Sequence, residues 1–213
     1  AGLPIRGEIL TALMVNMMMT AHPRSTVVVP VHASSAVEQI ARRHDGNVIR
    51  TKASPTALME ACQEDPNVVL GGSGETGFIF PELHPGFDAM FCIAKLIEML
   101  TVQERSLAEI RTELPRVCHK SYTMRCPWTI KGSLMRYLVE THPSDELELI
   151  DGVKVINPHN DNWVLVLPDA GEPLVHIFAN GDDRAWVDHT LREYRQRVQD
   201  FIDKEQGVEA VNV

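Results

Sequence analysis

The sequence predicts an α/β protein in two parts, a layered α/β domain followed by a smaller α+β domain. In the first part, short β-branched runs alternate with segments of helical period, an order typical of a layered domain with mostly parallel strands. The alternation stops at Pro115. After it, short strands, a strand pair around a tight turn and two helices are predicted. We therefore expect domains at residues 1–116 and 117–213.

The elements of the first part are marked by their period and by their end signals. Apolar residues at helical spacing predict a helix over 6–21, whose methionines indicate either core filling or an interface between copies. Ser54 followed by Pro55 marks a helix start, as an N-cap and a first-turn proline. Strands are predicted at Thr26–Pro30, Asn47–Thr51, 67–70 and 78–80, and further helices from Ser34 and Ser35 to residue 43, from residue 55, at 86–100 and at 106–114.

The second part has a different pattern, because its strands are short and follow one another. Residues 115–128 have strand-like character, and Trp128–Glu140 has the period of a helix. Further strands are predicted at 147–150, at Val153–Ile156 and on both sides of the turn in WVLVLPDAGEPLVHIF, residues 163–178. A helix over 183–204 carries an apolar stripe and completes a small α+β domain.

Charge and composition exclude several classes of partner. The formal net charge is -9 and the basic residues are scattered among acids, which argues against a nucleic-acid partner. The longest apolar runs are too short or too interrupted to span a bilayer, so we expect a soluble, cytoplasmic protein with no membrane partner. The cysteines have no Cys-x-x-Cys spacing and the histidines are dispersed, which predicts free thiols and no metal site.

A glycine-rich turn follows the strand predicted at 67–70. It consists of Gly71, Gly72, Ser73, Gly74, Glu75, Thr76 and Gly77. The glycines would let backbone amides approach a ligand, and the Glu75 carboxylate could accept hydrogen bonds from sugar hydroxyls. The alternative is a tight turn between two strands with a solvated Glu75. A dinucleotide loop or a Walker phosphate loop does not fit, because a strand follows and Lys is absent.

The turn of the second part carries the wrong charge for a phosphate. It consists of Leu167, Pro168, Asp169, Ala170, Gly171, Glu172 and Pro173, with His176 shortly after. Proteins hold phosphate with Arg, hydroxyl groups and backbone N–H groups, whereas Asp169 and Glu172 repel it. The N–H groups of Ala170 and Gly171 remain as donors, so at most weak binding of a sugar phosphate is expected.

The order of the elements and both turns resemble the third and fourth domains of the α-D-phosphohexomutases, the phosphoglucomutase and phosphomannomutase family. The family's third domain carries a sugar loop, Gly-Glu-x-Ser-Gly-His, before Phe-Ile-Phe, and LGGSGETGFIF takes its place here. The fourth domain carries a phosphate loop, Arg-Pro-Ser-Gly-Thr-Glu-Pro, followed by a second Arg, and LPDAGEPLVH aligns with it. The resemblance implies a third-domain α/β layer and a fourth domain with a fold like that of the TATA-box-binding protein.

The positions of both loops match those of the family better than their side chains do. It places the two family arginines of the phosphate loop at Leu167 and His176, its serine at Asp169, its glycine at Ala170 and its threonine at Gly171, while Pro168, Glu172 and Pro173 match. In the sugar loop, an ungapped alignment places Ser73 and Glu75 where the family has Glu and Ser, and Gly77 where it has His. No residue of this chain is therefore assigned a catalytic role.

A narrower resemblance indicates a different parent protein. The run CPW at Cys126–Trp128, the following KG and MR pairs, DGVKV at 151–155 and WVLVLPDAGEPLVH at 163–176 are similar to the mutase-like tail of bacterial sugar-1-phosphate nucleotidyltransferases. Those chains are of the mannose-1-phosphate guanylyltransferase type, and their phosphate loop is commonly degenerate. The resemblance thus implies a non-catalytic C-terminal region that serves assembly, stabilisation or sugar-phosphate sensing.

Two other functions remain as alternatives. The chain could be the C-terminal half of a phosphomannomutase or phosphoglucomutase, active only together with its first two domains. Those missing N-terminal domains would be its partners, and they would carry the family's phosphoserine and magnesium loops, so no cofactor is expected in this part. An oligomerisation module, forming a homo-oligomer, is the third hypothesis. In each case we expect this chain to be inactive alone, whereas its parent chain would be an enzyme in the first two.

Overall fold

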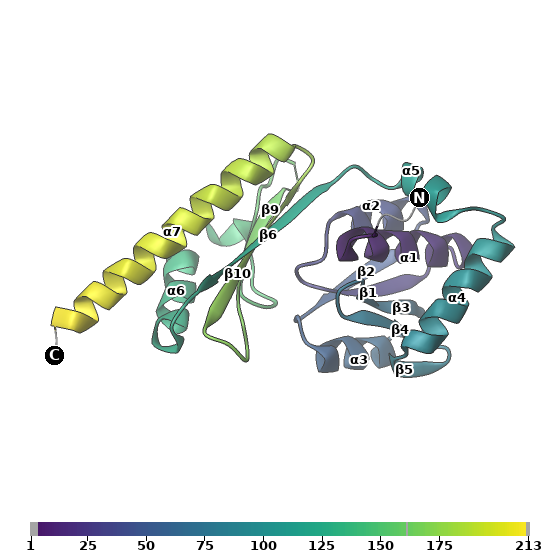
Figure 1. Ribbon diagram of the computed structural model, residues 1–213, viewed down its shortest axis with the longest axis horizontal. Coiled ribbons are helices and arrows are strands. Elements are labelled where there is room, and N and C mark those ends of the chain that lie inside the picture. The colour runs from purple at the N-terminus through teal and green to yellow at the C-terminus, as the bar shows by residue number, and fades with distance from the viewer. Residues whose placement is uncertain (1–3, 161, 212–213) are drawn as a thin grey trace. The chain divides into compact units, whose positions relative to one another are not determined.

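The computed structural model describes residues 4–160 and 162–211. The chain divides into two compact units, Ala1–Arg116 and Val117–Val213, at the position where the alternation of strands and helices stops. Each unit has its own five-stranded sheet (Figure 1). The expected α/β class is confirmed, whereas separate folding of the two units stays a prediction.

The sheet of the first unit is mixed, with the strand order β2-β1-β3-β4-β5. Strand β1 (Thr26–Pro30) pairs in parallel with β2 (Asn47–Thr51) and with β3 (Val68–Ser73). Strands β4 (Gly77–Phe80) and β5 (His84–Phe87) are antiparallel to their neighbours. The expectation of mostly parallel strands is wrong at this edge, because the turn from β3 to β4 is far too short for a crossover.

The helices of the first unit are α1 (Gly7–Ala21), α2 (Ala36–Arg43), α3 (Pro55–Glu64), α4 (Ala89–Val102) and α5 (Leu107–Glu113). Helices α3, α4 and α5 each begin at a side-chain cap. The Ser54 hydroxyl accepts a hydrogen bond from the Ala57 N–H, and the Asp88 carboxylate accepts one from the Phe91 N–H. Asp88 therefore starts α4 after β5, a strand that the sequence did not predict because we extended the helix back to residue 86.

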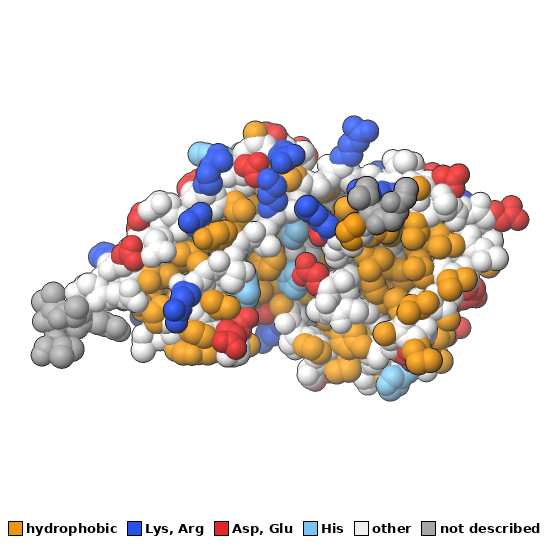
Figure 2. All heavy atoms as spheres, in the orientation of Figure 1, with side chains coloured by type: hydrophobic (Ala, Val, Ile, Leu, Met, Phe, Trp, Pro, Cys, Tyr) orange, Lys and Arg blue, Asp and Glu red, His pale blue; other side chains and the backbone are white. Residues whose placement is uncertain are grey.

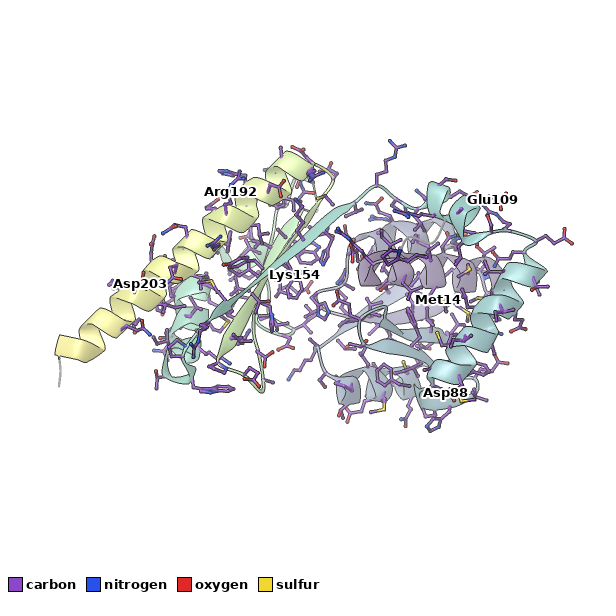
Figure 3. All side chains as sticks on the ribbon, in the orientation of Figure 1. Met14, Asp88, Glu109, Lys154, Arg192 and Asp203 are labelled. Carbon is purple, nitrogen blue, oxygen red and sulfur yellow. The ribbon has the colours of Figure 1, made fainter. Side chains whose placement is uncertain are left out.

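The core of the first unit is closed on both faces of its sheet. All five residues of β1 are buried. Helix α3 packs Leu58 and Cys62 against Val28. Helix α1 contacts α2, α4, α5 and β3, and its methionines are buried, including Met14 in Figure 3. The interpretation of this helix as an interface between copies is therefore wrong.

The second unit is an antiparallel sheet with two long helices, which confirms the α+β prediction. Its strands are β6 (Cys118–Arg125), β7 (Leu147–Glu148), β8 (Val153–Ile156), β9 (Trp163–Pro168) and β10 (Leu174–Gly181), in the order β6-β10-β9-β8-β7. Its helices are α6 (Trp128–Glu140), the short 3₁₀ turn η1 (Ser144–Glu146) and α7 (Arg184–Val211). Helix α7 is longer, and β7 shorter, than predicted.

Alternation along the strands builds the core of this unit. Val164, Val166, Val175 and Ile177 belong to one buried cluster with residues of α6 and α7, such as Leu134 and Val198.

All four cysteines of the chain are free, as predicted. Within residues 4–160 and 162–211, every helix is too short or too polar to cross a membrane.

Candidate functional site

The glycine-rich loop is a three-residue turn at the carboxyl end of β3. Ser73 pairs with Gly77 across the antiparallel ladder, so Gly74, Glu75 and Thr76 form the tip. The Ser73 hydroxyl accepts hydrogen bonds from the N–H groups of Thr76 at 3.3 Å and Glu75 at 3.4 Å. The Thr11 hydroxyl accepts one from the Gly74 N–H at 2.8 Å. Side chains thus hold the turn in one conformation without a ligand.

The glycines of this turn are required by the backbone. Gly72 and Gly77 have φ values of +104° and +99°, which side chains disfavour. A Cβ atom at Gly74 would lie 2.2 Å from the Gly7 carbonyl oxygen, and one at Gly71 would lie 2.2 Å from Cys62 Sγ. Close packing and backbone conformation therefore explain the glycines of the turn. Any contact of the turn with a ligand would come from its side chains.

The side chain of Glu75 is the exposed functional group of the turn. It is 62% exposed, and its Oε2 atom lies 3.9 Å from His32 Nε2. His32 comes shortly after β1, so both residues lie at the carboxyl edge of the parallel strands, where α/β sheets bind ligands. A carboxylate at this edge can accept hydrogen bonds from two hydroxyl groups of a polyol.

The turn of the second unit connects β9 to β10 and begins at Asp169. The Asp169 N–H donates to the Leu174 carbonyl at 3.1 Å, and the Cys126 N–H donates to the Pro173 carbonyl at 2.8 Å. These bonds fix both sides of the turn. Leu167 and Pro168 end β9, Ala170, Gly171, Glu172 and Pro173 lie in the turn, and His176 lies in β10.

The Asp169 carboxylate occupies the donors of its own turn. The N–H groups of Gly171 and Glu172 each donate to Asp169 Oδ1 at 2.8 Å. His176 Nε2 lies 2.9 Å from Oδ2, and because an ionised carboxylate only accepts, Nε2 carries the proton. The bond from His176 and the two N–H bonds lower the pKa of Asp169 to about 2. An internal anion therefore uses the Gly171 N–H that we expected to remain available.

The carbonyl groups of the same turn are held by Lys131 of α6. Its Nζ atom donates to the Asp169 carbonyl at 2.6 Å and to the Glu172 carbonyl. The same Nζ lies 3.6 Å from the centre of the Trp128 ring, a cation–π contact. Because Lys131 is buried, its charged ammonium group binds backbone carbonyl oxygens of the turn rather than solvent.

The register of β9 and β10 brings together the two positions that correspond to arginines in the resembling family. Leu167 pairs with His176 across the ladder. Leu167 is buried and apolar. The Nδ1 atom of His176 lies 2.9 Å from the Thr123 hydroxyl, while its Nε2 is taken by Asp169. Both ring nitrogens of His176 and two backbone N–H groups of the turn are therefore already engaged by side chains of the same unit.

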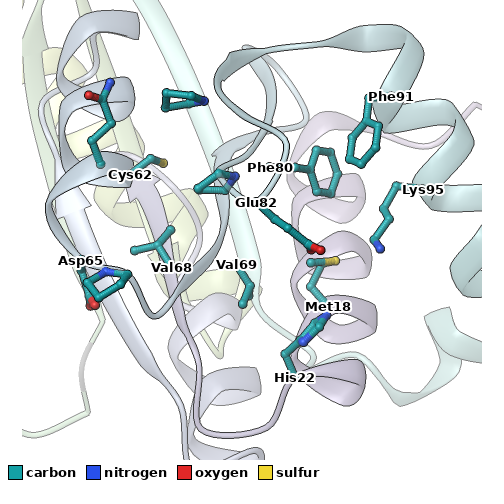
Figure 4. Close-up of a pocket in the computed structure, with 14 residues that line it drawn as sticks. Met18, His22, Cys62, Asp65, Val68, Val69, Phe80, Glu82, Phe91 and Lys95 are labelled. Carbon is teal, nitrogen blue, oxygen red and sulfur yellow. The ribbon is translucent and has the colours of Figure 1, made fainter.

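A separate cavity of about 630 Å³ lies in the first unit (Figure 4). Met18, Phe80 and Phe91 contribute to its apolar lining, and Glu82 and Lys95 to its polar lining. It reaches Val68 at the amino end of β3, whereas the glycine-rich turn leaves the carboxyl end. Burial raises the pKa of the Cys62 thiol in its wall to about 11, so this cysteine is not an activated nucleophile.

Two site residues were not predicted from the sequence. His32 had a usable signal, since it follows the carboxyl end of a predicted strand. Lys131 was noted only as part of the KG pair of the narrower resemblance, and its contact with the turn was not predicted, because a lysine inside an amphipathic helix is usually solvated. Among residues 4–160 and 162–211, no three His, Cys, Asp or Glu side chains are grouped closely enough to hold a metal ion.

Comparison with protein families gives a match over residues 6–118, to the α/β/α domain III of phosphoglucomutase/phosphomannomutase. A probable phosphoglucosamine mutase of Methanopyrus kandleri is 33% identical over 181 residues, which cover 83% of this chain and 38% of that protein. A phosphoglucomutase/phosphomannomutase of Thermococcus kodakarensis is 27% identical over 195 residues, covering 89% of this chain and 40% of that protein. The chain thus spans about two-fifths of the length of these relatives.

Solved structures support the fold over both units. The structure of a phosphoglucomutase/phosphomannomutase family protein from Burkholderia thailandensis has a TM-score of 0.71 at 17% identity, covering 90% of this chain and 40% of that chain. The N-acetylphosphoglucosamine mutase of Aspergillus fumigatus has a TM-score of 0.66 at 12% identity, covering 92% of this chain and 44% of that chain. At these identities the likeness concerns the fold alone.

Proposed function

We infer, from the premise that this chain belongs to the phosphoglucomutase/phosphomannomutase family, that it is the sugar-recognition half of a phosphohexomutase-type protein. The observation that carries the proposal is the exposed Glu75 at the carboxyl edge of the domain III sheet. Phosphoryl transfer, and the magnesium it uses in this proposal, belong to other parts of the parent protein. We also propose that the protein is cytoplasmic.

The proposed substrate class is a hexose phosphate. The mutase names of the relatives support this class, and the chemistry of the Glu75 turn agrees with it. Glu75 would accept hydrogen bonds from ring hydroxyls, with the Thr76 hydroxyl beside it. The turn at Asp169 would take no part in holding the phosphate, because its carboxylate already fills the turn.

The proposal is tested on the chain itself by titrating glucosamine-6-phosphate and glucose-1-phosphate while following backbone amide signals. We expect saturable shifts at residues 73–77, with millimolar affinity, and none at 167–176. The matched variant Glu75→Gln keeps the size of the side chain and should weaken binding at least about fivefold. Amide shifts at other residues, with no shift at residues 73–77, would contradict the proposal.

A second candidate is the non-catalytic tail of a sugar-1-phosphate nucleotidyltransferase of the mannose-1-phosphate guanylyltransferase type. The filled turn at Asp169 favours it, because a mutase needs its phosphate loop open. The relatives reported above favour the mutase.

The two candidates separate in an assay of the protein encoded by the complete reading frame. Interconversion of hexose 1- and 6-phosphates, activated by a hexose bisphosphate, supports the mutase-type parent. Release of pyrophosphate from GTP and mannose-1-phosphate, without interconversion, supports the nucleotidyltransferase parent.

A further inference from the structure

Arg50 is an arginine whose charged group lies inside the first unit rather than in solvent. Most Lys and Arg side chains on the face shown in Figure 2 project from the surface. The Arg50 side chain is only 10% exposed, near the carboxyl end of β2, and its partner Glu38 is 32% exposed. Desolvation offsets much of the attraction within a buried ion pair, so stability alone does not explain this one.

The guanidinium group of Arg50 binds three carbonyl groups of one loop. Its Nη1 atom donates to the carbonyl groups of Val31 and Ala33, each at 2.9 Å. It also donates to the carbonyl group of Pro30 at 3.4 Å. Nε and Nη2 donate to the two carboxylate oxygens of Glu38, at 2.8 and 3.0 Å. The rigid fork of the guanidinium thus holds the loop and the carboxylate in one geometry, which the single ammonium of a lysine does not impose.

His32 lies between the two carbonyl groups that Arg50 binds most closely, those of residues 31 and 33. The loop connects β1 to α2, and Glu38 lies in the first turn of α2. Arg50 therefore links this loop to β2 on one side and to α2 on the other. The His32 side chain is 14% exposed, and its Nε2 atom lies 3.9 Å from Glu75 Oε2. The position of the imidazole beside Glu75 thus depends on a loop whose backbone Arg50 holds.

We propose that Arg50 is a positioning residue of the hexose phosphate site at the Glu75 turn, an inference that rests on the proposed function of that turn. The separation of 3.9 Å between His32 Nε2 and Glu75 Oε2 lets one ligand hydroxyl group bond to both atoms. The hydroxyl group can accept from an imidazole N–H and donate to a carboxylate. Without Arg50 the carbonyl groups of the loop lose their common donor, and His32 no longer keeps its place beside Glu75.

The first test needs no ligand and uses the full 213-residue chain. At one fixed pH, Glu75→Gln should shift the imidazole NMR signals of His32 in the wild-type background, because the two side chains are neighbours. In the Arg50→Met background, the same Glu75→Gln change should shift these signals at least about twofold less. The difference between the two backgrounds measures how far Arg50 places His32 beside Glu75.

Arg105→Met is the matched control for this measurement. Arg105 donates to both carboxylate oxygens of Glu113 from the segment between α4 and α5, so the variant also removes an arginine from a bidentate pair. It should keep the full wild-type response of His32.

A double variant separates positioning from folding. Arg50→Met leaves the half-buried Glu38 carboxylate without its partner, whereas Arg50→Met with Glu38→Gln removes both charges. Removal of a whole buried ion pair is often neutral for stability, so the double variant should melt close to the wild type. It still lacks the donor for the loop carbonyl groups, and the response of His32 to Glu75→Gln should stay reduced. A purely structural role of the pair predicts that the response recovers together with the stability.

Titration with glucosamine-6-phosphate connects the loop to the proposed function. Both Arg50 variants should bind at least about fivefold more weakly than the wild type, followed at residues 73–77, and Arg105→Met should bind equally well. If the wild type itself shows no binding, the proposed function fails, and the response of His32 alone decides whether Arg50 positions the loop.

Three results would overturn the positioning role of Arg50. The first is a wild-type His32 that does not respond to Glu75→Gln. The second is a full response in the folded double variant. The third is undiminished binding of glucosamine-6-phosphate in both Arg50 variants.

Discussion

Lys131 and Asp169 are joined through the main chain rather than through their charges. Lys131 Nζ donates to the carbonyl oxygen of Asp169 at 2.6 Å, while the Asp169 carboxylate accepts the N–H groups of Gly171 and Glu172. Acceptors and donors of the turn are thus satisfied by two side chains of the same unit. This arrangement determines what each substitution in the turn should do.

Replacing the internal carboxylate should open the turn to anions. Asp169→Ala frees the N–H groups of Gly171 and Glu172 and the Nε2–H of His176, and removes a negative charge that repels phosphate. Like charges about 4 Å apart repel by about 1 kcal/mol in water. We expect the variant to bind inorganic phosphate at least about tenfold more tightly than the wild type, measured from amide shifts of residues 169–176.

The control for that experiment is Asp169→Asn. The amide oxygen can still accept from the two backbone N–H groups, so the turn stays filled while the charge is lost. We therefore expect only the charge effect, a smaller gain in phosphate affinity than when the carboxylate is removed altogether. Equal gains in both variants would show that charge alone, and not occupancy of the donors, keeps phosphate out.

The lowered pKa of Asp169 predicts a pH-dependent contribution to stability. A carboxyl group whose pKa is lower in the folded state stabilises that state above its unfolded pKa of about 3.9. The contribution is lost as the pH falls toward the folded value of about 2. Urea unfolding of wild type and Asp169→Asn should therefore differ at pH 6 and converge between about pH 4 and pH 2. A difference that does not change over this range would contradict the assignment.

Removing the Lys131 ammonium should destabilise the second unit. Lys131→Met keeps most of the buried stem but leaves the carbonyl groups of Asp169 and Glu172 without a charged donor. We expect a loss of about 2 kcal/mol in the free energy of unfolding, and faster amide exchange at Gly171 and Glu172. Lys120→Met is the control, since the Lys120–Asp188 ion pair is partly exposed and should contribute less to stability than Lys131.

The chain alone should have no mutase activity. The chain spans about two-fifths of the length of its mutase relatives, and the Asp169 carboxylate already accepts the N–H groups of its own turn. A coupled assay with glucose-1-phosphate or mannose-1-phosphate and a bisphosphorylated hexose should give background turnover at every protein concentration. Turnover proportional to the chain's concentration would show that a nucleophile has been overlooked.

Limited proteolysis should separate the two units. Arg116 is exposed and lies outside regular structure between α5 and β6. Trypsin is therefore expected to cleave after Arg116, and not after Arg125, which pairs with Leu174 at the far end of β6. Both fragments should keep their helical signal after separation. Cleavage at Arg125 first, or loss of structure after the cut, would contradict independent units.

The fold could be predicted largely because local signals were strong. Ser54 with Pro55 fixed the start of α3, and the β-branched run of β1 fixed a strand buried on both faces. Strand β5 could not be predicted, because His84–Phe87 contains Pro and Gly and pairs with β4 only through tertiary contacts. A tight turn between two strands was one of the two interpretations of the glycine-rich segment, and the antiparallel pairing of β3 with β4 confirms it.

The site was predicted less completely, since its chemistry depends on partners distant in sequence. The sequence showed that Asp169 places a negative charge in the turn, but not that this charge binds the turn's own N–H groups. The contact of Lys131 with the turn spans 38 residues and has no local signature. Helix α4 was visible as an apolar segment, yet only the structure shows that Met99 faces the core while Met90 and Ile97 are exposed.

The Asp169 carboxylate belongs to the same chain as the N–H groups that it binds, so its local concentration does not depend on the dissolved anions with which it competes. A tethered group acts at an effective concentration of at least about a millimolar, whatever the composition of the surrounding solution. The turn at Asp169 should therefore keep one shape whether hexose phosphates are scarce or abundant. If the proposed function holds, a response to hexose phosphate should begin at the Glu75 turn rather than at the turn of Asp169.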